Sequence, residues 1–249
     1  MKEKEMIFGI RAVMEAVEAG KDIDKVMVKR ELSGDLFQEL QQLLRSYEIP
    51  MQRVPLERID RITRKNHQGV IAFTSAVTYQ KLENIIPMLY EEGKNPFILV
   101  LDGVTDVRNF GAIARTCEVA GVNAIVIPAR GSVTVNADAI KTSAGALHTI
   151  PVCREQNLKE AIIFLKNSGI KVVAATEKAA SFYTDCDFTV PAAIVMGAED
   201  EGVGTDHLRV SDELVKIPQS GNIQSLNVSV AAGVLIYEVI RQRNLTMGN

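Results

Sequence analysis

Short apolar runs alternate with helical patterns from residue 96 to the end of this 249-residue chain. The first run is FILVLDGV, and later runs are NAIVIPA, KVVAATE, AAIVMGAE and ELVKIP, with helical stretches over 109–121, 158–169 and 228–240. Continuous apolar strands that alternate with helices are typical of a parallel sheet covered on both faces. In such sheets ligands bind beyond the carboxyl ends of the strands. The pattern therefore predicts an α/β domain over residues 96–249 with a ligand site just after its strands.

Residues 1–75 predict a second, smaller α/β unit. Helical and strand patterns again alternate, but the runs are shorter and the strands are mixed in character. The second expected helix has Ser33 or Asp35 near its N-cap. The expected helices are 7–20, 33–49 and a basic helix near 58–67, and the expected strands are 23–30, 50–55 and 68–77.

Residues 76–95 are expected to join the two units. The segment contains Pro87 and Gly93, and Pro96 follows it directly. Proline and glycine interrupt regular structure, so we interpret this segment as a linker that carries one helix, LENIIPMLYEEG.

Composition excludes several classes of protein. The three cysteines, Cys117, Cys153 and Cys186, are widely spaced and form no CxxC pair, which fits reduced thiols and neither a disulfide framework nor a zinc site. The three histidines are equally scattered, so no metal is expected. No apolar run approaches the roughly 18 residues of a membrane span, and the apolar stretch after the charged start is too short for a signal peptide. We therefore expect a cytoplasmic protein without a membrane segment.

The net charge of −3 does not predict a nucleic-acid-binding protein, but one window is basic. The stretch RIDRITRKNH contains four cations against Asp60 alone. A local patch of this kind binds phosphates even on an acidic protein, although a solvated helix end would have the same composition. The expected RNA-binding residues, here called the basic cluster, are Arg58, Arg61, Arg64 and Lys65.

Small and polar residues follow three of the expected strands. The segments are DGVTDVRNFG after the first strand, GAEDEGVG after IVM, and QSGNIQSLN after VKI. Glycine at such places lets the backbone turn sharply and approach a ligand. Neither GxGxxG nor GxxxxGK[ST] follows the first strand, so a Rossmann dinucleotide site and a P-loop are not supported. A ligand of cofactor size would be held by loops of another design.

These three segments resemble the three motifs of the SpoU-type (TrmH-like) RNA ribose 2′-O-methyltransferases. The resemblance covers residues 96–243, and Ala198 departs from it where many members carry Asn. Residues 1–75 resemble the substrate-binding domain, similar to ribosomal protein L30e, that precedes the catalytic domain in one branch. The stretch NHQGVIA is typical of the 23S ribosomal RNA guanosine branch. The motif residues are Asn109 and Arg115 in the first, Gly197 and Glu199 in the second, and Ser225, Leu226 and Asn227 in the third.

The resemblance implies a trefoil knot formed by the C-terminal strands, S-adenosylmethionine as cofactor, and a homodimer built through the knotted domain. It also implies transfer of a methyl group to a ribose 2′-hydroxyl, with a guanosine of 23S ribosomal RNA as the favoured substrate. Transfer RNA is the alternative substrate. A non-catalytic RNA-binding protein with the same knotted fold is the alternative of another class.

The same resemblance assigns the candidate site residues. Arg115 could be catalytic, or a snorkelling or ion-paired side chain on an apolar helix; its protonation role stays open, because guanidinium keeps its proton above pH 12. Asn109 could also lie near a helix N-cap. Ser225 could be a plain N-cap with Asn227 exposed. The expected catalytic residues are Arg115, Asn109, Glu199, Ser225 and Asn227, and the expected cofactor contacts are Thr176, Met196, Gly197, Ile217, Ser225 and Leu226.

Overall fold

The computed structural model describes residues 6–221 and 225–247, which form two compact units. The first unit runs to Thr78 and includes Thr134–Asn136, and the second contains Tyr79–Val133 and the chain from Ala137 onward. Residues 79–95, expected as a linker, therefore belong to the second unit. Among the described residues, no helix is both long and apolar enough to cross a membrane.

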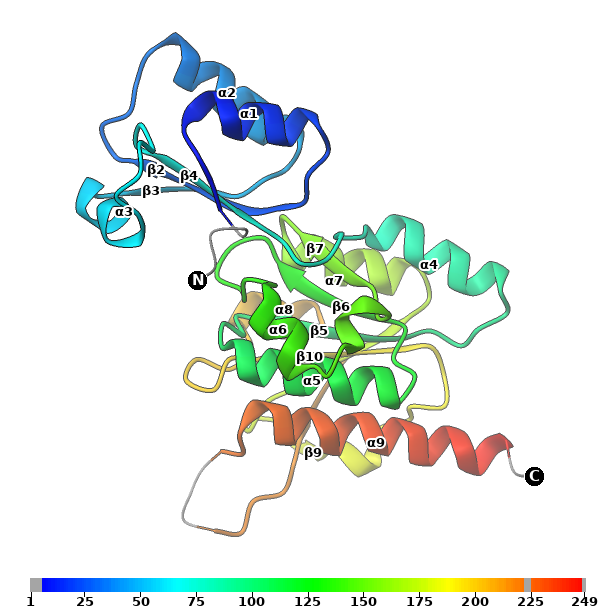
Figure 1. Cartoon of the computed structure of the whole chain (residues 1–249). Coiled ribbons are helices and arrows are strands. Elements are labelled where there is room, and N and C mark those ends of the chain that lie inside the picture. Colours follow the sequence, from blue (N-terminus) through cyan, green and yellow to red (C-terminus); the bar gives the residue numbers. More distant parts are fainter. Residues whose placement is uncertain (1–5, 222–224, 248–249) are drawn as a thin grey trace. The chain divides into compact units, whose positions relative to one another are not determined.

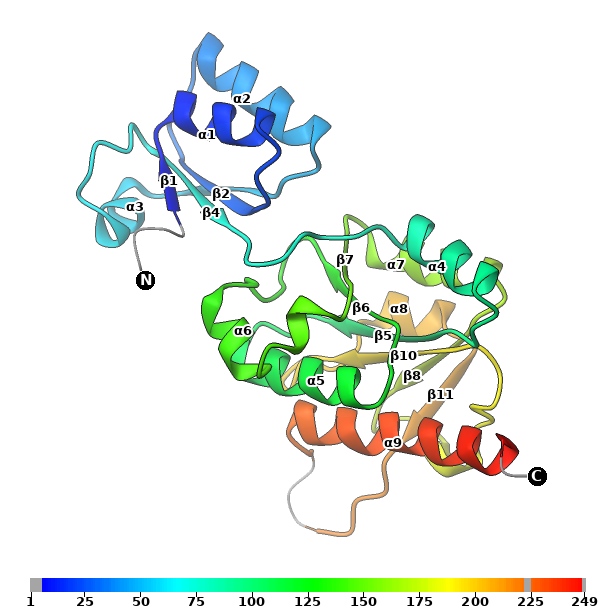
Figure 2. The same cartoon turned by 45° about the vertical axis from the view of Figure 1, so that its right-hand side comes forward.

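The first unit is a four-stranded sheet with helices on both faces (Figure 1, Figure 2). On strand β2 (Ile23–Lys29), Val26 and Val28 pack with the first two helices of the chain, whereas Met27 packs with the third. The alternation arises because successive side chains of a strand point to opposite faces of the sheet. The strand order is β1 (Met6–Phe8), β4 (Val70–Thr74), β2 (Ile23–Lys29) and β3 (Met51–Val54), and the helices are α1 (Ile10–Glu18), α2 (Asp35–Ser46) and α3 (Leu56–Ile62).

Two glycines set helix starts that the sequence pattern located only approximately. Gly9, with φ 86°, separates β1 from α1, so the helix expected over 7–20 is a short strand followed by a shorter helix. Gly34, with φ 102°, is the N-cap of α2, and no side chain caps this helix. Positive φ favours glycine over other residues, which explains both starts.

The second unit contains a seven-stranded sheet whose neighbouring strands all run parallel, so the predicted parallel α/β domain is confirmed. β7 and β9 are additional to the expected strands. β10 lies between β5 and β8, and its Gly197 pairs with Asp102 at the carboxyl edge. The strand order is β7 (Val152–Glu155), β6 (Ala124–Pro128), β5 (Phe97–Asp102), β10 (Ala192–Gly197), β8 (Lys171–Ala175), β11 (Glu213–Lys216) and β9 (Ser181–Phe182).

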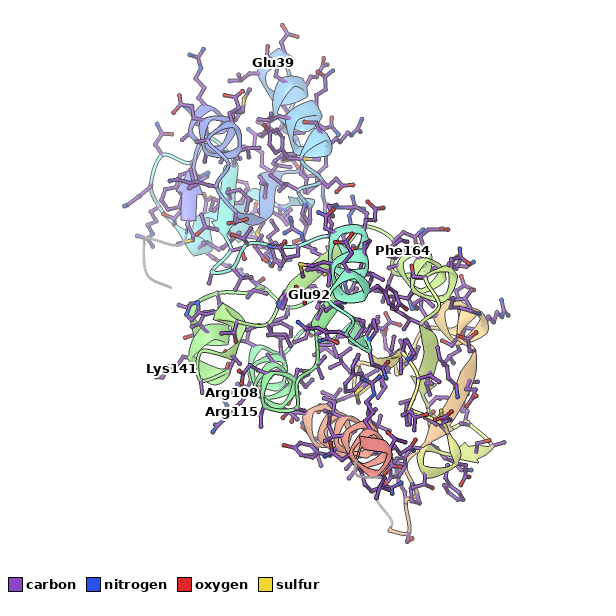
Figure 3. All side chains as sticks on the ribbon, turned by 90° about the vertical axis from the view of Figure 1, so that its right-hand side faces the viewer. Glu39, Glu92, Arg108, Arg115, Lys141 and Phe164 are labelled. Carbon is purple, nitrogen blue, oxygen red and sulfur yellow. The ribbon has the colours of Figure 1, made fainter. Side chains whose placement is uncertain are left out.

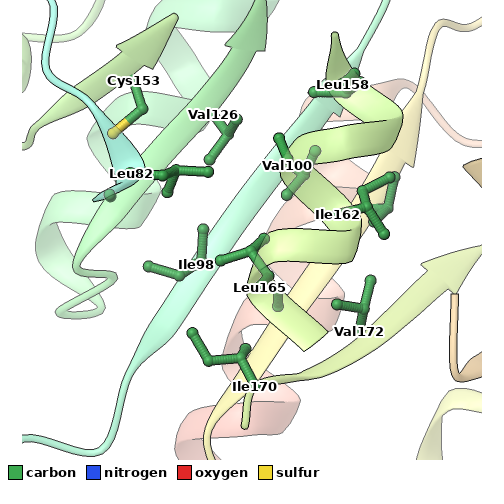
Figure 4. Packing of buried hydrophobic residues seen from close by; sticks show 14 of the residues in the cluster. Leu82, Ile98, Val100, Val126, Cys153, Leu158, Ile162, Leu165, Ile170 and Val172 are labelled. Atoms are coloured by element: carbon green, nitrogen blue, oxygen red, sulfur yellow. The ribbon is translucent and has the colours of Figure 1, made fainter. Parts of the chain in front are cut away.

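Helices cover both faces of this sheet (Figure 1, Figure 2). α4 (Leu82–Glu91), α7 (Leu158–Asn167) and α8 (Thr205–Val210) pack on one face, and Figure 4 shows side chains of α4 and α7 against β5, β6 and β8. α5 (Val107–Val119), α6 (Ala137–Thr142) and α9 (Val228–Met247) lie on the other. Two short 3₁₀ turns, η2 (Ala146–His148) and η3 (Tyr183–Asp185), complete the secondary structure described.

The helix expected within the linker forms as α4, which packs into the second unit. Its Leu82, Ile85, Ile86 and Leu89 are at most 6% exposed and lie in the core of the second unit. Burial of four large aliphatic side chains stabilises by roughly 1.5–3 kcal/mol each, which binds the helix to the sheet despite Pro87 inside it. The trefoil knot stays a prediction.

Candidate active site

A pocket of about 410 Å³ lies beyond the carboxyl ends of β8, β10 and β11. All six residues expected to contact a cofactor line it, from three segments that are far apart in the chain. Residues 222–224 of the third motif lie outside the described residues. The lining residues are 175–178 after β8, 196–202 after β10, and Lys216, Ile217, Gln219, Ser225, Leu226, Val228 and Ala231 around the third motif. We call this cavity the strand-end pocket.

The second loop (residues 198–204) folds back tightly on the end of β10. The N–H of Gly202 donates to the carbonyl of Ala198 at 2.9 Å. A Cβ placed on Gly197 would lie 1.9 Å from the carbonyl carbon of Gly202 and 2.1 Å from the nitrogen of Val203. Because these are backbone atoms, only glycine fits at position 197 in this conformation.

A carboxylate anchors the far end of the same loop. Asp102, the last residue of β5, accepts hydrogen bonds from the N–H of Gly204 at 2.8 Å and from Nδ1 of His207 at 2.6 Å. The side chains of Asp102 and His207 are only 17% and 21% exposed. The pair therefore joins the end of the first motif's strand to the start of α8, and it fixes the wall of the strand-end pocket. Sequence reasoning did not identify either residue.

Three predicted residues meet beside the pocket and form what we call the amide cluster: Asn109, Glu199 and Asn227. Oε1 of Glu199 accepts hydrogen bonds from Nδ2 of Asn227 at 2.5 Å and from Nδ2 of Asn109 at 3.3 Å. Nδ2 of Asn227 also donates to Oδ1 of Asn109 at 3.0 Å. The backbone N–H of Val228 donates to the same Glu199 oxygen at 3.1 Å. Glu199 therefore joins all three motifs within one chain.

Helix capping explains how Asn109 and Asn227 are placed at the starts of α5 and α9. Asp106, and not Asn109, is the N-cap of α5, where its Oδ1 accepts from the N–H of Arg108 and of Asn109. Asn227 directly precedes α9, and its Oδ1 accepts from the N–H of Ser229 at 3.0 Å. Ser225 is thus not the cap of this helix; it lines the strand-end pocket.

Arg115 stays apart from the amide cluster. It is exposed on α5 and makes no hydrogen bond or ion pair with any residue in the described ranges. It lies six residues after Asn109, which is close to 9 Å along a helix axis. Figure 3 shows it at the edge of the second unit. A structural ion pair, one of the alternatives for this side chain, is therefore not supported.

The basic cluster is divided in the first unit. Arg61 and Arg64 line a cavity of about 750 Å³ together with Glu57, Asp60 and His67, and Nε2 of His67 lies 3.0 Å from Oδ1 of Asp60. The remaining members lie elsewhere: Arg58 is exposed on α3, and Nζ of Lys65 lies 5.7 Å from the centroid of the Phe8 ring. The four cations therefore do not line one cavity.

Neither cysteine chemistry nor a metal centre is evident in the described part of the chain. All three thiols are buried, and burial raises the pKa of Cys153 and of Cys186 to about 12, so neither is a nucleophile at neutral pH. No group of three His, Cys, Asp or Glu side chains gathers there in a metal-binding arrangement.

Comparison with known proteins agrees with this geometry. The profile of the SpoU rRNA Methylase family matches residues 96–237, and the profile for RNA 2′-O ribose methyltransferase substrate binding matches residues 6–80. YacO of Bacillus subtilis, whose name assigns it to the TrmH family of tRNA/rRNA methyltransferases, is 34% identical over 243 residues, which is 98% of each chain. A Staphylococcus saprophyticus protein with the same family assignment is 34% identical over 97% of each chain.

Solved structures agree as well. An rRNA methyltransferase from Sinorhizobium meliloti, crystallised with S-adenosylmethionine, is 26% identical with a TM-score of 0.61, and the match covers 95% of this chain and 87% of that one. The SpoU methyltransferase AviRb from Streptomyces viridochromogenes matches with a TM-score of 0.62 at 22% identity, over 97% and 90% of the two chains, and shows the fold alone. The predicted family resemblance is thus confirmed, and the chain belongs to the SpoU family of RNA methyltransferases.

Proposed function

We propose that this protein transfers a methyl group from S-adenosylmethionine to a ribose 2′-hydroxyl of RNA. One observation carries the proposal: a pocket of cofactor size, built by three strand-end loops, lies directly beside the amide cluster that joins all three motifs. The family's cofactor use, its substrate-binding domain and the bound cofactor of the Sinorhizobium meliloti neighbour support the same activity.

The residues of the strand-end pocket suit this cofactor. Its volume of about 410 Å³ lies in the range of about 300–1,000 Å³ that is typical of small-molecule sites. Met196, Ile217 and Leu226 offer apolar surface for the adenine ring, and Gly197 lets backbone groups approach closely. The lining contains four carboxylates, on Glu177 and residues 199–201, against the two cations Lys178 and Lys216. This excess of negative charge favours a cation such as a sulfonium.

Arg115 is the residue that we assign to the ribose. When bound, S-adenosylmethionine supplies an electrophilic methyl group on a sulfonium, which becomes a neutral thioether on transfer. The attacking 2′-hydroxyl is a weak acid. Negative charge develops on its oxygen as the O–CH₃ bond forms and the S–CH₃ bond breaks, and its proton leaves to solvent water. A guanidinium group is a cation at neutral pH, and that of Arg115 has no partner among the described residues. It therefore stabilises the developing alkoxide and does not act as a base.

The amide cluster positions the surrounding loops in this scheme. Glu199 fixes Asn227 at the start of α9 and Asn109 near the start of α5. Both helix starts are therefore held next to the strand-end pocket, and Ser225 lies in the wall of that pocket. We propose that four residues align the RNA with the cofactor: Asn109, Glu199, Ser225 and Asn227.

A guanosine of 23S ribosomal RNA is our proposed substrate, and it places the protein in the cytoplasm. The SpoU rRNA Methylase profile over residues 96–237 and the NHQGVIA stretch in the first unit support a ribosomal target. Transfer RNA remains the second candidate, because the curated relatives carry names that include both RNA classes. The basic cluster of the first unit would contribute phosphate contacts in either case.

We also propose that the second unit forms a homodimer through α9. Val230 and Tyr237 on this helix are 53% and 51% exposed, and they lie seven residues apart on one face. Gly233 between them has nothing within 4 Å of an added Cβ, so a second helix could approach closely. Sedimentation should give a dimer, and Tyr237→Lys should give monomers; a monomeric wild type would contradict this interface.

The activity test uses the full chain, S-adenosylmethionine with a labelled methyl group, and both RNA classes from a strain that lacks the gene. Label should appear in 23S ribosomal RNA as 2′-O-methylguanosine after digestion to nucleosides. Arg115→Ala should lower transfer by about 10² or more, while its melting temperature stays near wild type because the side chain is exposed and unpaired.

Three outcomes would count against the proposal. Binding of the cofactor and RNA without transfer to either RNA class would favour the non-catalytic RNA-binding alternative. Label in transfer RNA alone would move the substrate to that class. Near-normal transfer by Arg115→Ala would remove this residue from the reaction.

A further inference from the structure

Three exposed cations surround the contact between α5 and α6. Arg108 and Arg115 project from α5 and Lys141 from α6, and Figure 3 shows all three along the same edge of the second unit. None of them forms an ion pair with an acidic residue within the described ranges. We call these three residues the cationic face. The activity proposed above uses only Arg115.

The packing of the two helices explains why the cations gather here. Positions 108, 111 and 115 form one stripe of α5, because residues three, four and seven apart share a helix face. Gly111 has no side chain, and Thr142 of α6 occupies the space above it: a Cβ on Gly111 would lie 2.0 Å from Oγ1 of Thr142. The end of α6 therefore crosses α5 between the two arginines, and Lys141 lies beside this crossing.

A cavity of about 610 Å³ opens at this crossing, and Arg108 and Lys141 are its cationic lining residues. It also contains the carboxylates of Asp106 and Asp138, but neither forms an ion pair with Arg108 or Lys141. Asp106 instead caps α5 by accepting from two backbone N–H groups. The cavity thus presents two cations that have no ion-pair partner among the described residues.

We infer that Arg108 and Lys141 bind the phosphate backbone of the RNA next to the ribose that Arg115 contacts. This inference rests on the proposed function and names the surface that orients its substrate. Arg108 directly precedes Asn109 of the amide cluster, so a strand held at this cavity passes the reaction site. The three cations then have separate roles. Phosphate contacts of Arg108 and Lys141 fix the register of the RNA strand, and Arg115 contacts the ribose oxygen.

The test measures RNA affinity of the full chain as a function of salt, with a short fluorescein-labelled single-stranded RNA and with 23S ribosomal RNA transcribed in vitro. The variant is Arg108→Gln with Lys141→Gln. Its Kd for RNA should rise about tenfold. The slope of log K against log salt should become shallower by about 1.4, since each phosphate contact on a single strand contributes roughly 0.7. The Kd for S-adenosylmethionine should not change, because neither residue lines the strand-end pocket.

The matched control is Arg209→Gln with Lys94→Gln, which removes one arginine and one lysine at exposed positions of the same unit. It should leave the RNA affinity and the salt slope at wild-type values. An unchanged slope in the Arg108/Lys141 variant, with methyl transfer intact in wild type, would overturn this inference alone. A wild-type protein that neither binds nor methylates RNA would overturn the proposed function together with it. Equal losses in variant and control would show a general charge effect and would also overturn it.

Discussion

Gly197→Ala is the sharpest test of the strand-end pocket. The added carbon would lie 1.9 Å from the carbonyl carbon of Gly202 and 2.1 Å from its oxygen, whereas packed carbons approach to about 3.5–4.0 Å. The backbone of the second loop must therefore move by roughly 1.5 Å or more. Its hydrogen bonds to Ala198 and to Asp102 oppose that movement.

The cost can be bounded from general values. Overpacking of this kind costs about 1–3 kcal/mol, and the displaced loop carries a large part of the pocket lining. If this whole cost opposes cofactor binding, the affinity for S-adenosylmethionine drops by about 5- to 150-fold. Isothermal calorimetry on the full chain measures the Kd, and circular dichroism with a melting curve reports whether the variant folds.

Two further variants keep this experiment decisive. Gly221→Ala makes the same chemical change in the third motif, where an added carbon meets nothing within 4 Å, and it should bind the cofactor as wild type does. Leu226→Ala removes a pocket residue that is 40% exposed, so it should fold normally and bind more weakly even if Gly197→Ala fails to fold. A folded Gly197→Ala protein whose Kd stays within about twofold of wild type would refute the placement of the cofactor in this pocket.

Other regions of the chain give three more predictions. His207→Ala removes one hydrogen bond that anchors the second loop to Asp102 and should weaken cofactor binding about fivefold in the same calorimetric assay; unchanged affinity would make the pair irrelevant to the site. Replacing the whole basic cluster by alanine should weaken RNA binding and flatten its salt dependence without altering cofactor affinity, and an unchanged slope would leave those cations as a solvated surface. Hydrogen bonds from Arg241 hold the pKa of Glu238 below its ordinary value, so Glu238→Gln should cost about 1 kcal/mol in urea unfolding at neutral pH. That difference should disappear as pH falls through the lowered folded-state pKa, and a difference that persists in acid would contradict the assignment.

The sequence predicted the second unit well because its strands are buried on both faces. Such strands read as continuous apolar runs, and the polar residues at their ends mark the carboxyl edge of the sheet. The same local patterns predicted the helix α4 but not its place in the core of the second unit. Leu82, Ile85, Ile86 and Leu89 have the spacing of a buried helical face, but Pro87 and Gly93 suggested a linker. Tertiary burial outweighed those local signals.

Long-range pairing was beyond the reach of sequence patterns. Asn109 and Asn227 are 118 residues apart, and Asp102 and His207 are 105 apart. Parallel topology predicts that strand ends meet at one edge, but side-chain partners depend on strand order and register. Only the placement of β10 beside β5, with Gly197 opposite Asp102, brings these residues together. The resemblance to a family indicated which residues matter, and the fold shows which of them touch.

A comparison of two arginines decides what kind of residue Arg115 is. Arg243 on α9 is the structural type: it donates to the carbonyl groups of Phe188 and Val190 and to Asn95, and burial lowers the pKa of its guanidinium. Each of its three guanidinium nitrogens donates at least one hydrogen bond, as burial of a charge requires. Arg115 has none of these features, since it is exposed and unpaired in the described part of the chain. Arg115 also lies seven residues beyond Arg108 on the same helix face. An exposed cation without an ion pair among the described residues fits the role that we propose for Arg115, which is contact with an anionic strand that carries the reacting ribose.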